Sequence, residues 1–308
     1  MSEILLRAPA TIANFGPGFD VFALALAAPS DAFRLRRTDA PGVAVRIVDG
    51  ADALPTEPER NTAGLAALRF FETTGRRGGV EIEIHKAMPI GSGLGSSAAS
   101  AVAAAFGLDR LFGTGLAAPD LIEIASQGEA ASGGTAHADN VSASFLGGFV
   151  IVRNRHPLRI DRLETPALPI VVRVRRKSLT TSRGLIPDHL PLVQVKEQMA
   201  WCAAVVHAMA AGDARRVGEA INRDHISEPV RSGYIPGYAD LKARALEAGA
   251  WGFNVSGGGS SVFAICPPDR LDAVAGLLRA PVAADGGGAP LVIVTKSSNE
   301  GVREIHGL

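Results

Sequence analysis

The sequence predicts an α+β fold divided into two domains, and three observations lead to this prediction. A chain of 308 residues has about the length of two average domains. Runs with the two-residue period of strands alternate with longer runs of helix-forming residues in both halves. Prolines and charged residues interrupt these runs between residues 154 and 169. We therefore expect residues 1–160 and 161–308 to form separate domains.

The first half contains five expected strands and three expected helices. Alternating or continuous apolar runs predict strands at residues 4–9, 33–36, 43–47, 80–85 and 147–152. Proline-free runs of good helix formers predict helices at 62–74 and 98–112. A further helix is expected at 119–131, because Pro119 suits the first turn of a helix.

The second half repeats the mixture. Strands are expected at 170–174, 261–266 and 291–296, and helices at 193–211, 214–222, 238–248 and 270–278. The glycine-rich residues 283–289 are expected to form a surface loop.

Composition and charge are those of an ordinary globular protein and do not indicate a nucleic-acid-binding or membrane protein. Hydrophobic residues make up 47% and charged residues 20% of the chain, as in ordinary soluble proteins. The 31 basic and 31 acidic residues cancel, so charge gives no reason to expect a nucleic-acid or membrane partner. The basic cluster at 173–177 is interpreted as a solvated strand edge.

The two cysteines, Cys202 and Cys266, lie in apolar surroundings and fit no metal motif, so we expect buried, reduced thiols.

The start of the chain has no signal-peptide pattern. Met1-Ser2-Glu3-Ile4 lacks a basic segment followed by an apolar one. No uninterrupted apolar run approaches the length that spans a bilayer. A cytoplasmic location is therefore expected.

A glycine- and serine-rich segment lies between an expected strand and an expected helix. It comprises Pro89, Ile90, Gly91, Ser92, Gly93, Leu94, Gly95, Ser96 and Ser97. Such a turn lets backbone N–H groups converge on an anion at the positive end of the helix dipole. Hydroxyl groups at this position can cap the helix or bind a phosphate-bound Mg²⁺. The segment predicts a nucleoside triphosphate site, and a plain flexible turn is the alternative.

Two familiar phosphate motifs do not match this segment. A P-loop requires a lysine after its last glycine, and none follows here. The dinucleotide pattern G-x-G-x-x-G requires a third glycine at the position of Ser96. That pattern also needs an acidic residue about 20 positions downstream at a strand end, whereas Asp109 lies within or just after the expected helix.

Several other polar residues could carry chemistry. Glu129 could hold Mg²⁺ together with substrate phosphates, because Mg²⁺ needs few protein ligands; a solvated surface glutamate is the alternative. Asp139, in the string His137-Ala138-Asp139-Asn140, could bind an ammonium group, act as a base or cap an element. Arg183 and Arg231 have guanidinium groups that suit a carboxylate or phosphate, and for each a surface charge is the alternative.

Two further segments have the composition of turns. The first runs from Asn14 to Asp20 and combines two glycines, a proline and two polar side chains. The second, Ser256-Gly257-Gly258-Gly259-Ser260-Ser261, precedes the apolar residues 262–265. Two glycine-rich turns could flank one ligand.

Taken together, these segments resemble the GHMP small-molecule kinases, named for galactokinase, homoserine kinase, mevalonate kinase and phosphomevalonate kinase. The resemblance covers nearly the whole chain, and residues 89–97 and 257–261 match two glycine motifs of the family. Four strings resemble its homoserine kinase branch: residues 14–20, Gly128-Glu129-Ala130, residues 137–140 and Glu228-Pro229-Val230-Arg231. The resemblance implies a ribosomal protein S5 domain 2-like N-terminal domain, a ferredoxin-like C-terminal domain and a homodimer.

The resemblance also implies an activity and a set of site residues. The implied reaction moves the ATP γ-phosphate to the hydroxyl of L-homoserine, a step of threonine biosynthesis, with Mg²⁺ held by Ser97 and Glu129. The backbone at 91–96 would surround the phosphates, with Pro89, Gly257 and Gly258 also at the nucleotide and Asn61 and Lys86 near the nucleoside. The residues implied for the amino-acid pocket are Asn14, Asp20, His137, Asp139, Arg183 and Arg231. No dedicated base is implied, and Asp139 is the second choice for that role.

The chain departs from the family pattern at two places. Ser260 takes the position of the proline in the third motif, G-x-G-P-S/T, which loosens that loop. The family's Thr-x-x-x-Arg spacing is one residue shorter at Thr180-Thr181-Ser182-Arg183. Two alternatives to the kinase follow from the residues: a dinucleotide-dependent oxidoreductase, and a nucleotide-binding module without catalytic activity.

Overall fold

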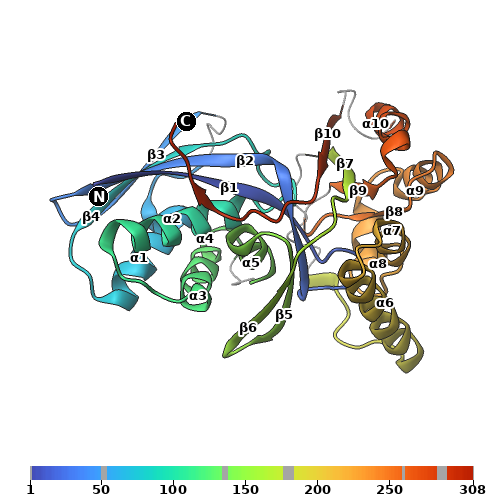
Figure 1. Cartoon of the computed structure of the whole chain (residues 1–308), viewed down its shortest axis with the longest axis horizontal. Helices are drawn as coiled ribbons and strands as arrows, with labels where there is room; N and C mark the ends of the chain where they lie inside the picture. The colour runs from blue at the N-terminus through green and yellow to red at the C-terminus, as the bar shows by residue number, and fades with distance from the viewer. Residues whose placement is uncertain are drawn as a thin grey trace.

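The computed structural model describes residues 2–49, 54–133, 138–175, 184–258, 261–282 and 290–307. Within these residues, strands and helices are mixed in two halves that lie side by side (Figure 1). No helix among them is long and apolar enough to cross a membrane. Both cysteines in this part of the chain are free thiols. Cys266 is buried as expected, but the expectation of a buried thiol is wrong for Cys202, which is partly exposed.

The first half is built on a seven-stranded sheet. Its strands are β1 (Glu3–Ala13), β2 (Phe22–Thr38), β3 (Gly42–Asp49), β4 (Gly79–His85), β5 (Phe149–Arg155), β6 (Leu158–Leu163) and β11 (Arg303–Glu304). The order is β11-β1-β2-β4-β3, and β5 pairs with both β2 and β6. β2 is long enough to pair with β5 through its first residues and with β4 through its last.

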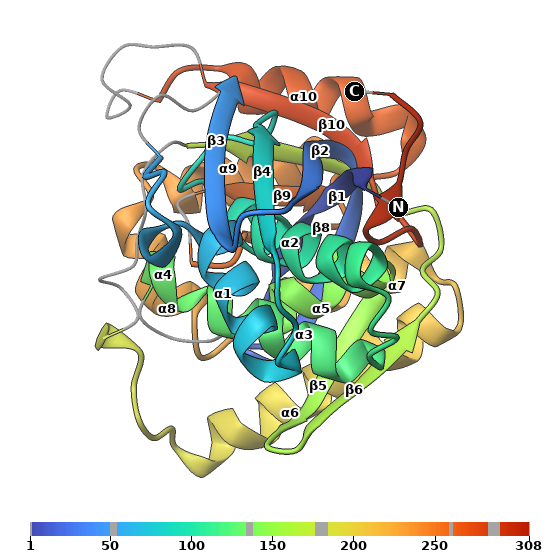
Figure 2. The ribbon, with the colours of Figure 1, turned by 90° about the vertical axis from the view of Figure 1, so that its left-hand side faces the viewer.

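Helices cover one face of this sheet. They are α1 (Thr62–Thr74), α2 (Ser96–Phe112), α3 (Ala118–Gly128), α4 (Ala130–Gly133) and α5 (Asp139–Leu146), and a short 3-10 helix, Pro58–Arg60, precedes α1. Figures 1 and 2 show α1, α2 and α3 together on the same side of the strands. α2 is buried along most of its length because its alanines let it pack closely between the sheet and its neighbours.

The second half contains a four-stranded sheet in the order β10-β7-β9-β8. These strands are β7 (Pro169–Val174), β8 (Gly252–Val255), β9 (Val262–Ile265) and β10 (Leu291–Lys296). The helices are α6 (Leu192–Ala210), α7 (Ala214–Ile221), α8 (Glu228–Arg231), α9 (Tyr238–Glu247) and α10 (Leu271–Arg279). Alternate residues of β9 pack into different clusters: Phe263 into the large core and Ala264 into a smaller one with Val274 of α10.

One large hydrophobic cluster includes side chains of both halves. Phe15 is fully buried in this cluster, stacked on Phe263 of β9 at 5.6 Å between ring centroids and edge-on to Phe149 of β5 at 5.8 Å. Aromatic pairs at these separations add to the stabilisation from area burial. The turn that contains Phe15 is therefore fixed between the two sheets.

The division into domains at residues 160 and 161 remains a proposal. That boundary lies inside β6, which pairs with β5 in the larger sheet. The end of the chain also returns to this sheet, where Leu26 bridges Ser297 and β11 pairs with β1. A division by sheets would therefore assign residues 161–163 and 303–304 to the first domain.

Some expected elements differ from the observed ones. β1 continues past Pro9 to Ala13, with a register irregularity between Pro9 and Thr11, because a proline without an N–H group interrupts a ladder without ending the strand. The helix expected at 119–131 is broken after Gly128. The interpretation of the 173–177 cluster as a solvated edge is wrong for Arg173, which is buried and donates to the carbonyl oxygens of Leu278 and Ala280 at the end of α10.

Candidate functional site

The glycine-rich segment, residues 89–97, forms the end of the loop between β4 and α2 and the first two residues of that helix, as expected. It is called the phosphate loop below, after its predicted ligand. Gly91, Gly93 and Gly95 all have positive φ, at 68°, 80° and 69°, a conformation that residues with a side chain rarely adopt. Gly95 is the N-cap of α2, and no side chain caps this helix. The expectation that a serine hydroxyl caps it is therefore wrong, and the first-turn N–H groups of α2 are not satisfied by a cap. Such groups favour an anion.

The loop is packed against the end of β1 and the start of α5. Thr11 of β1 donates its N–H to Leu94 O at 3.0 Å and its hydroxyl to Asn140 Oδ1 at 2.7 Å. A Cβ atom on Gly95 would lie 2.0 Å from the Thr11 hydroxyl oxygen. Only glycine fits here, so the loop backbone follows the surface that β1 and α5 provide.

The two serines after the loop have different surroundings. Ser96 is turned inward, where its hydroxyl and carbonyl accept hydrogen bonds from the Lys86 ammonium at 2.9 and 2.8 Å. Ser97, one residue on, donates a hydrogen bond to the carboxylate of Glu129. Of the two serines, Ser97 is therefore the one whose hydroxyl lies at a buried carboxylate.

Lys86 is enclosed beneath the loop. Besides Ser96, its Nζ atom contacts Asp31 Oδ2 at 2.6 Å and Ser100 Oγ at 2.7 Å. An ammonium group has three protons, and these four acceptors use them all. Desolvation lowers the pKa of Lys86 despite the nearby Asp31 carboxylate. The ammonium group of this lysine, which is expected near the nucleoside, therefore makes its hydrogen bonds to protein groups.

Glu129 occupies the break between α3 and α4. The preceding Gly128 packs so closely on α1 that a Cβ atom would lie 2.8 Å from Thr62 O. Glu129 is buried, and desolvation raises its pKa to about 7, with the nearby Asp139 carboxylate adding to the effect and Ser97 opposing it. Burial of a charged carboxylate is costly, so a cation at this position would stabilise the charged form.

The groups around Glu129 fit Mg²⁺. This ion prefers oxygen ligands and is bound through one or two carboxylates plus substrate phosphates. Three groups with oxygen ligands lie at the first turn of α2 or beside it: the Ser97 hydroxyl, the Glu129 carboxylate and the neighbouring Asp139 carboxylate. Within the described ranges, no group of three His, Cys, Asp or Glu residues is placed to hold a metal ion.

The turn at residues 14–20 is strained. Asn14, Phe15 and Asp20 all have positive φ, at 65°, 41° and 58°, and such residues cost of order 1–3 kcal/mol each. The Asn14 side chain holds the turn by accepting the N–H of Asp20 at 3.1 Å. Backbone strain of this kind concentrates at binding sites, where the surrounding packing maintains it.

The C-terminal half contributes Arg231 and the second glycine turn to the same region. The buried guanidinium of Arg231 donates from Nη1 to Gly257 O at 2.8 Å and lies over the Phe19 ring at 5.5 Å. Ser256 donates its hydroxyl to Gly93 O in the phosphate loop at 2.7 Å. The chain thus brings residues 14–20, the phosphate loop, Arg231 and Gly257 together from both halves.

Other expected residues have different positions. Asn61 is the N-cap of α1, where its oxygen accepts the N–H groups of Ala63 and Gly64 and its amide donates to Pro55 O. Gly258 lies beside Arg231, since a Cβ atom added to this glycine would lie 4.0 Å from the arginine Nη2. Asp139 begins α5 and is buried. His137, Arg183 and Ser260 lie outside the described residues.

Sequence reasoning missed several residues that build the site. Asp31 binds Lys86 and also accepts the N–H groups of Ala87 and Met88, both at 2.8 Å. Thr11 holds the phosphate loop by donating its N–H to Leu94 O. Ser256 belongs to the second expected turn, but the sequence does not predict its hydrogen bond to Gly93 O. These residues are distant in the chain from the motif they support, so no local pattern marks them.

Comparison with known proteins decides the family. The model of the GHMP kinases N terminal domain matches residues 61–148, and that of the GHMP kinases C terminal domain matches residues 205–283. Homoserine kinase from Methanopyrus kandleri is 44% identical over 270 residues, which cover 85% of this chain and 87% of that protein. The chain belongs to the GHMP kinase family. The expected family and its two-domain fold are confirmed.

Other relatives carry the same name. Homoserine kinase from Methanocella arvoryzae is 35% identical over 281 residues, covering 91% of this chain and 90% of that protein. The crystal structure of homoserine kinase from Cytophaga hutchinsonii has a TM-score of 0.90 and 36% identity, covering 99% of this chain and 98% of that one. Within the GHMP kinases the chain groups with the homoserine kinases. It is an ATP-dependent small-molecule kinase, and the oxidoreductase alternative is wrong.

Proposed function

We propose that this GHMP kinase transfers the γ-phosphate of ATP to the side-chain hydroxyl of L-homoserine, giving O-phospho-L-homoserine for threonine biosynthesis. The observation that carries the proposal is that the phosphate loop lies close to the buried guanidinium group of Arg231. Arg231 and Phe19 lie with Gly257, which is joined through Ser256 to Gly93 of the loop. A carboxylate on the acceptor and the phosphates of the donor would then bind to adjoining surfaces.

In this proposal the loop backbone at residues 91–96 and the first turn of α2 bind the ATP phosphates. The positive φ of Gly91, Gly93 and Gly95 and the uncapped start of α2 support this role. Pro89, Asn61, Lys86, Gly257 and Gly258 are retained as proposed nucleotide residues, with Lys86 acting through its contacts to Ser96.

Ser97 and Glu129 are proposed to hold Mg²⁺, with Asp139 nearby. When bound, the ion would neutralise charge on the phosphates that the loop holds. The raised pKa of Glu129, about 7, supports a position that favours a cation. Because phosphoryl transfer depends mainly on alignment and charge neutralisation, no dedicated base is proposed, and the hydroxyl proton passes to phosphate.

The amino-acid pocket is proposed to comprise residues from the strained turn, the start of α5 and two arginines. Arg231 would bind the carboxylate, because a guanidinium has five N–H donors and can hold Gly257 O and a carboxylate together. Asp139 would attract the ammonium first and act as a base second. The other proposed members are Asn14, Asp20, His137 and Arg183.

An acceptor panel tests this function. Purified protein with ATP and Mg²⁺ is assayed against L-homoserine, L-serine, (R)-mevalonate, shikimate and galactose, and L-homoserine should give the highest kcat/KM. The Arg231→Ala variant should raise the KM for L-homoserine at least tenfold with ATP KM unchanged. Arg244→Ala, which removes an exposed arginine of α9, is the matched control. Preference for another acceptor would reject the substrate, and ATP binding without any turnover would favour a silent module.

A homodimer and a cytoplasmic location are further proposals. The resemblance supports the dimer, and so do the exposed apolar side chains of Leu192, Val193 and Met199 on α6. Light scattering after size exclusion should give a mass twice that of the single chain, which is 31.9 kDa. No partner membrane or nucleic acid is proposed.

A further inference from the structure

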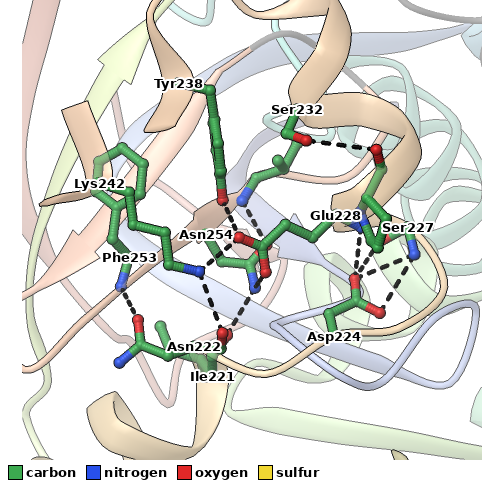
Figure 3. Close-up of polar contacts among 12 residues, drawn as sticks. Ile221, Asn222, Asp224, Ser227, Glu228, Ser232, Tyr238, Lys242, Phe253 and Asn254 are labelled. Atoms are coloured by element: carbon green, nitrogen blue, oxygen red, sulfur yellow. Dashed lines mark hydrogen bonds and ion pairs between the residues drawn. The ribbon is translucent and has the colours of Figure 1, made fainter. Parts of the chain in front are cut away.

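Glu228 lies at the centre of a polar network in the C-terminal half (Figure 3). Its Oε1 atom accepts hydrogen bonds from the Tyr238 hydroxyl, at 2.7 Å, and from the Lys242 ammonium. Its Oε2 atom accepts from Asn254 Nδ2 at 3.3 Å. Glu228 belongs to α8, Tyr238 and Lys242 to α9, and Asn254 to β8. One carboxylate therefore ties three elements together.

A second carboxylate fixes the start of α8. Asp224 accepts the N–H of Glu228 at 2.8 Å and that of Ile226 at 2.8 Å, together with the N–H and hydroxyl of Ser227. A helix of four residues has little stability of its own. The position of α8 therefore depends on these side chains, which Figure 3 shows converging on its first turn.

Arg231 is the last residue of this short helix. It lies three positions after Glu228, and its guanidinium is placed by Gly257 O at 2.8 Å and by the Phe19 ring. Gly257 in turn follows Asn254 by three positions, beyond the end of β8. The network holds both elements that meet at the Arg231–Gly257 contact: α8 through Glu228 and the Gly257 turn through Asn254.

Other contacts make this arrangement rigid. Asn254 Nδ2 also donates to Ile221 O at 2.6 Å, and Lys242 Nζ donates to Asn222 O at 3.1 Å. The Glu228 and Lys242 side chains are only 13% and 19% exposed, so water competes weakly for their charges. Charge-assisted hydrogen bonds in such surroundings are strong and directional.

We propose that Glu228 is a positioning residue, which acts through Tyr238, Lys242 and Asn254 to hold Arg231 where it binds the acceptor carboxylate. This role rests on the proposed function and adds a residue set to it. A rigid helix would present the guanidinium in one orientation and so lower the entropy lost when the substrate binds. Without the network, α8 would move and the acceptor would bind less tightly, with little change in the ATP site.

The test is a kinetic double-mutant cycle with E228Q, R231A and the combined variant. E228Q keeps the size of the side chain but loses its charge; we expect KM for L-homoserine to rise about tenfold, with kcat and ATP KM within about twofold. Tyr238→Phe should raise the same KM less. In the R231A background E228Q should have no further effect, because the arginine that Glu228 positions is absent.

Two results would overturn the positioning role alone. One is an unchanged KM for L-homoserine in E228Q, even if its melting temperature falls. The other is the same fold increase in both backgrounds, which a general structural role would produce. A wild-type enzyme that does not phosphorylate L-homoserine instead contradicts the proposed function. In that case a crystal structure of E228Q still decides the role: loss of the Arg231–Gly257 hydrogen bond supports it, and a retained bond overturns it.

Discussion

The ammonium group of Lys86 lies 2.6 Å from the carboxylate of Asp31, with both side chains almost completely buried. Asp31 also accepts two N–H groups at the entry to the phosphate loop, from Ala87 and Met88, while Lys86 binds Ser96 at its exit. The pair therefore holds both ends of the loop. This gives Lys86 a structural route to nucleotide binding that needs no contact with the nucleotide.

Breaking the Lys86–Asp31 pair should cost stability as well as ATP affinity. Lys86→Met leaves a buried carboxylate without its cation, and such a loss costs about 3–5 kcal/mol in the free energy of unfolding. Urea denaturation at constant pH measures this loss, and steady-state kinetics should show a higher KM for ATP because the loop is less fixed.

The combined variant Lys86→Met with Asp31→Asn is the control for this prediction. Because it removes both charges, its loss of stability should be clearly smaller than the sum of the two single losses. A Lys86→Met protein of wild-type stability that binds ATP poorly would show that Lys86 acts by touching the nucleotide.

Gly95→Ala should disable the phosphate loop. The new methyl group would lie 2.0 Å from the Thr11 hydroxyl oxygen, on a residue with φ of 69°. Gly115→Ala is a matched control, since Gly115 has a similar φ of 64° but nothing within 4 Å of a Cβ atom. Nucleotide titration followed by fluorescence should show a loss of ATP binding in the first variant only. Equal losses in both would assign the effect to backbone strain.

Glu129 predicts a pH dependence of stability in the protein without metal or nucleotide. Its folded pKa of about 7 lies above the ordinary 4.5, so the native state binds more protons than the unfolded state between these values. Stability should fall as pH rises through this window. Glu129→Gln lacks this loss. In EDTA, the free energy of unfolding of the variant minus that of wild type should therefore become more positive by about 3 kcal/mol between pH 4.5 and pH 7.5.

Glu123→Gln provides a control of opposite sign. Burial pushes the pKa of Glu123 upward, but hydrogen bonding and the charge of Arg155 outweigh it and lower that pKa. The stability that Glu123 contributes is therefore present above pH 4.5 and is lost as pH falls through its folded pKa. A flat difference between Glu129→Gln and wild type across pH 4.5–7.5 would contradict the burial argument.

Much of the fold follows from local pattern. The helix expected at 62–74 coincides with α1, because Asn61 caps it and Gly75 ends it in a left-handed conformation. The strand expected at 170–174 lies within β7. Elements without a clear pattern are not predicted: β6 lies in the charged region interpreted as a domain boundary, and β8 has only four residues, all buried. Such segments form because neighbouring strands pair with them.

The site was predictable only where one segment contains it. The glycines of the phosphate loop, with their positive φ, and the strained turn at 14–20 both have local signatures. The supporting contacts join residues far apart in the chain, such as Asp31 with Lys86 and Ser256 with Gly93. A sequence pattern contains no signal for such pairs. The different surroundings of Ser96 and Ser97 likewise depend on which way the first turn of α2 faces.

The most direct test of the proposed function identifies the product. Wild-type protein is incubated with ATP, Mg²⁺ and L-homoserine, and the mixture is followed by phosphorus and proton NMR. We expect a phosphomonoester resonance coupled to the side-chain CH₂ group of homoserine, formed together with ADP in equal amount. ATP consumption without this coupled signal, or its faster appearance on another acceptor, would contradict the assignment.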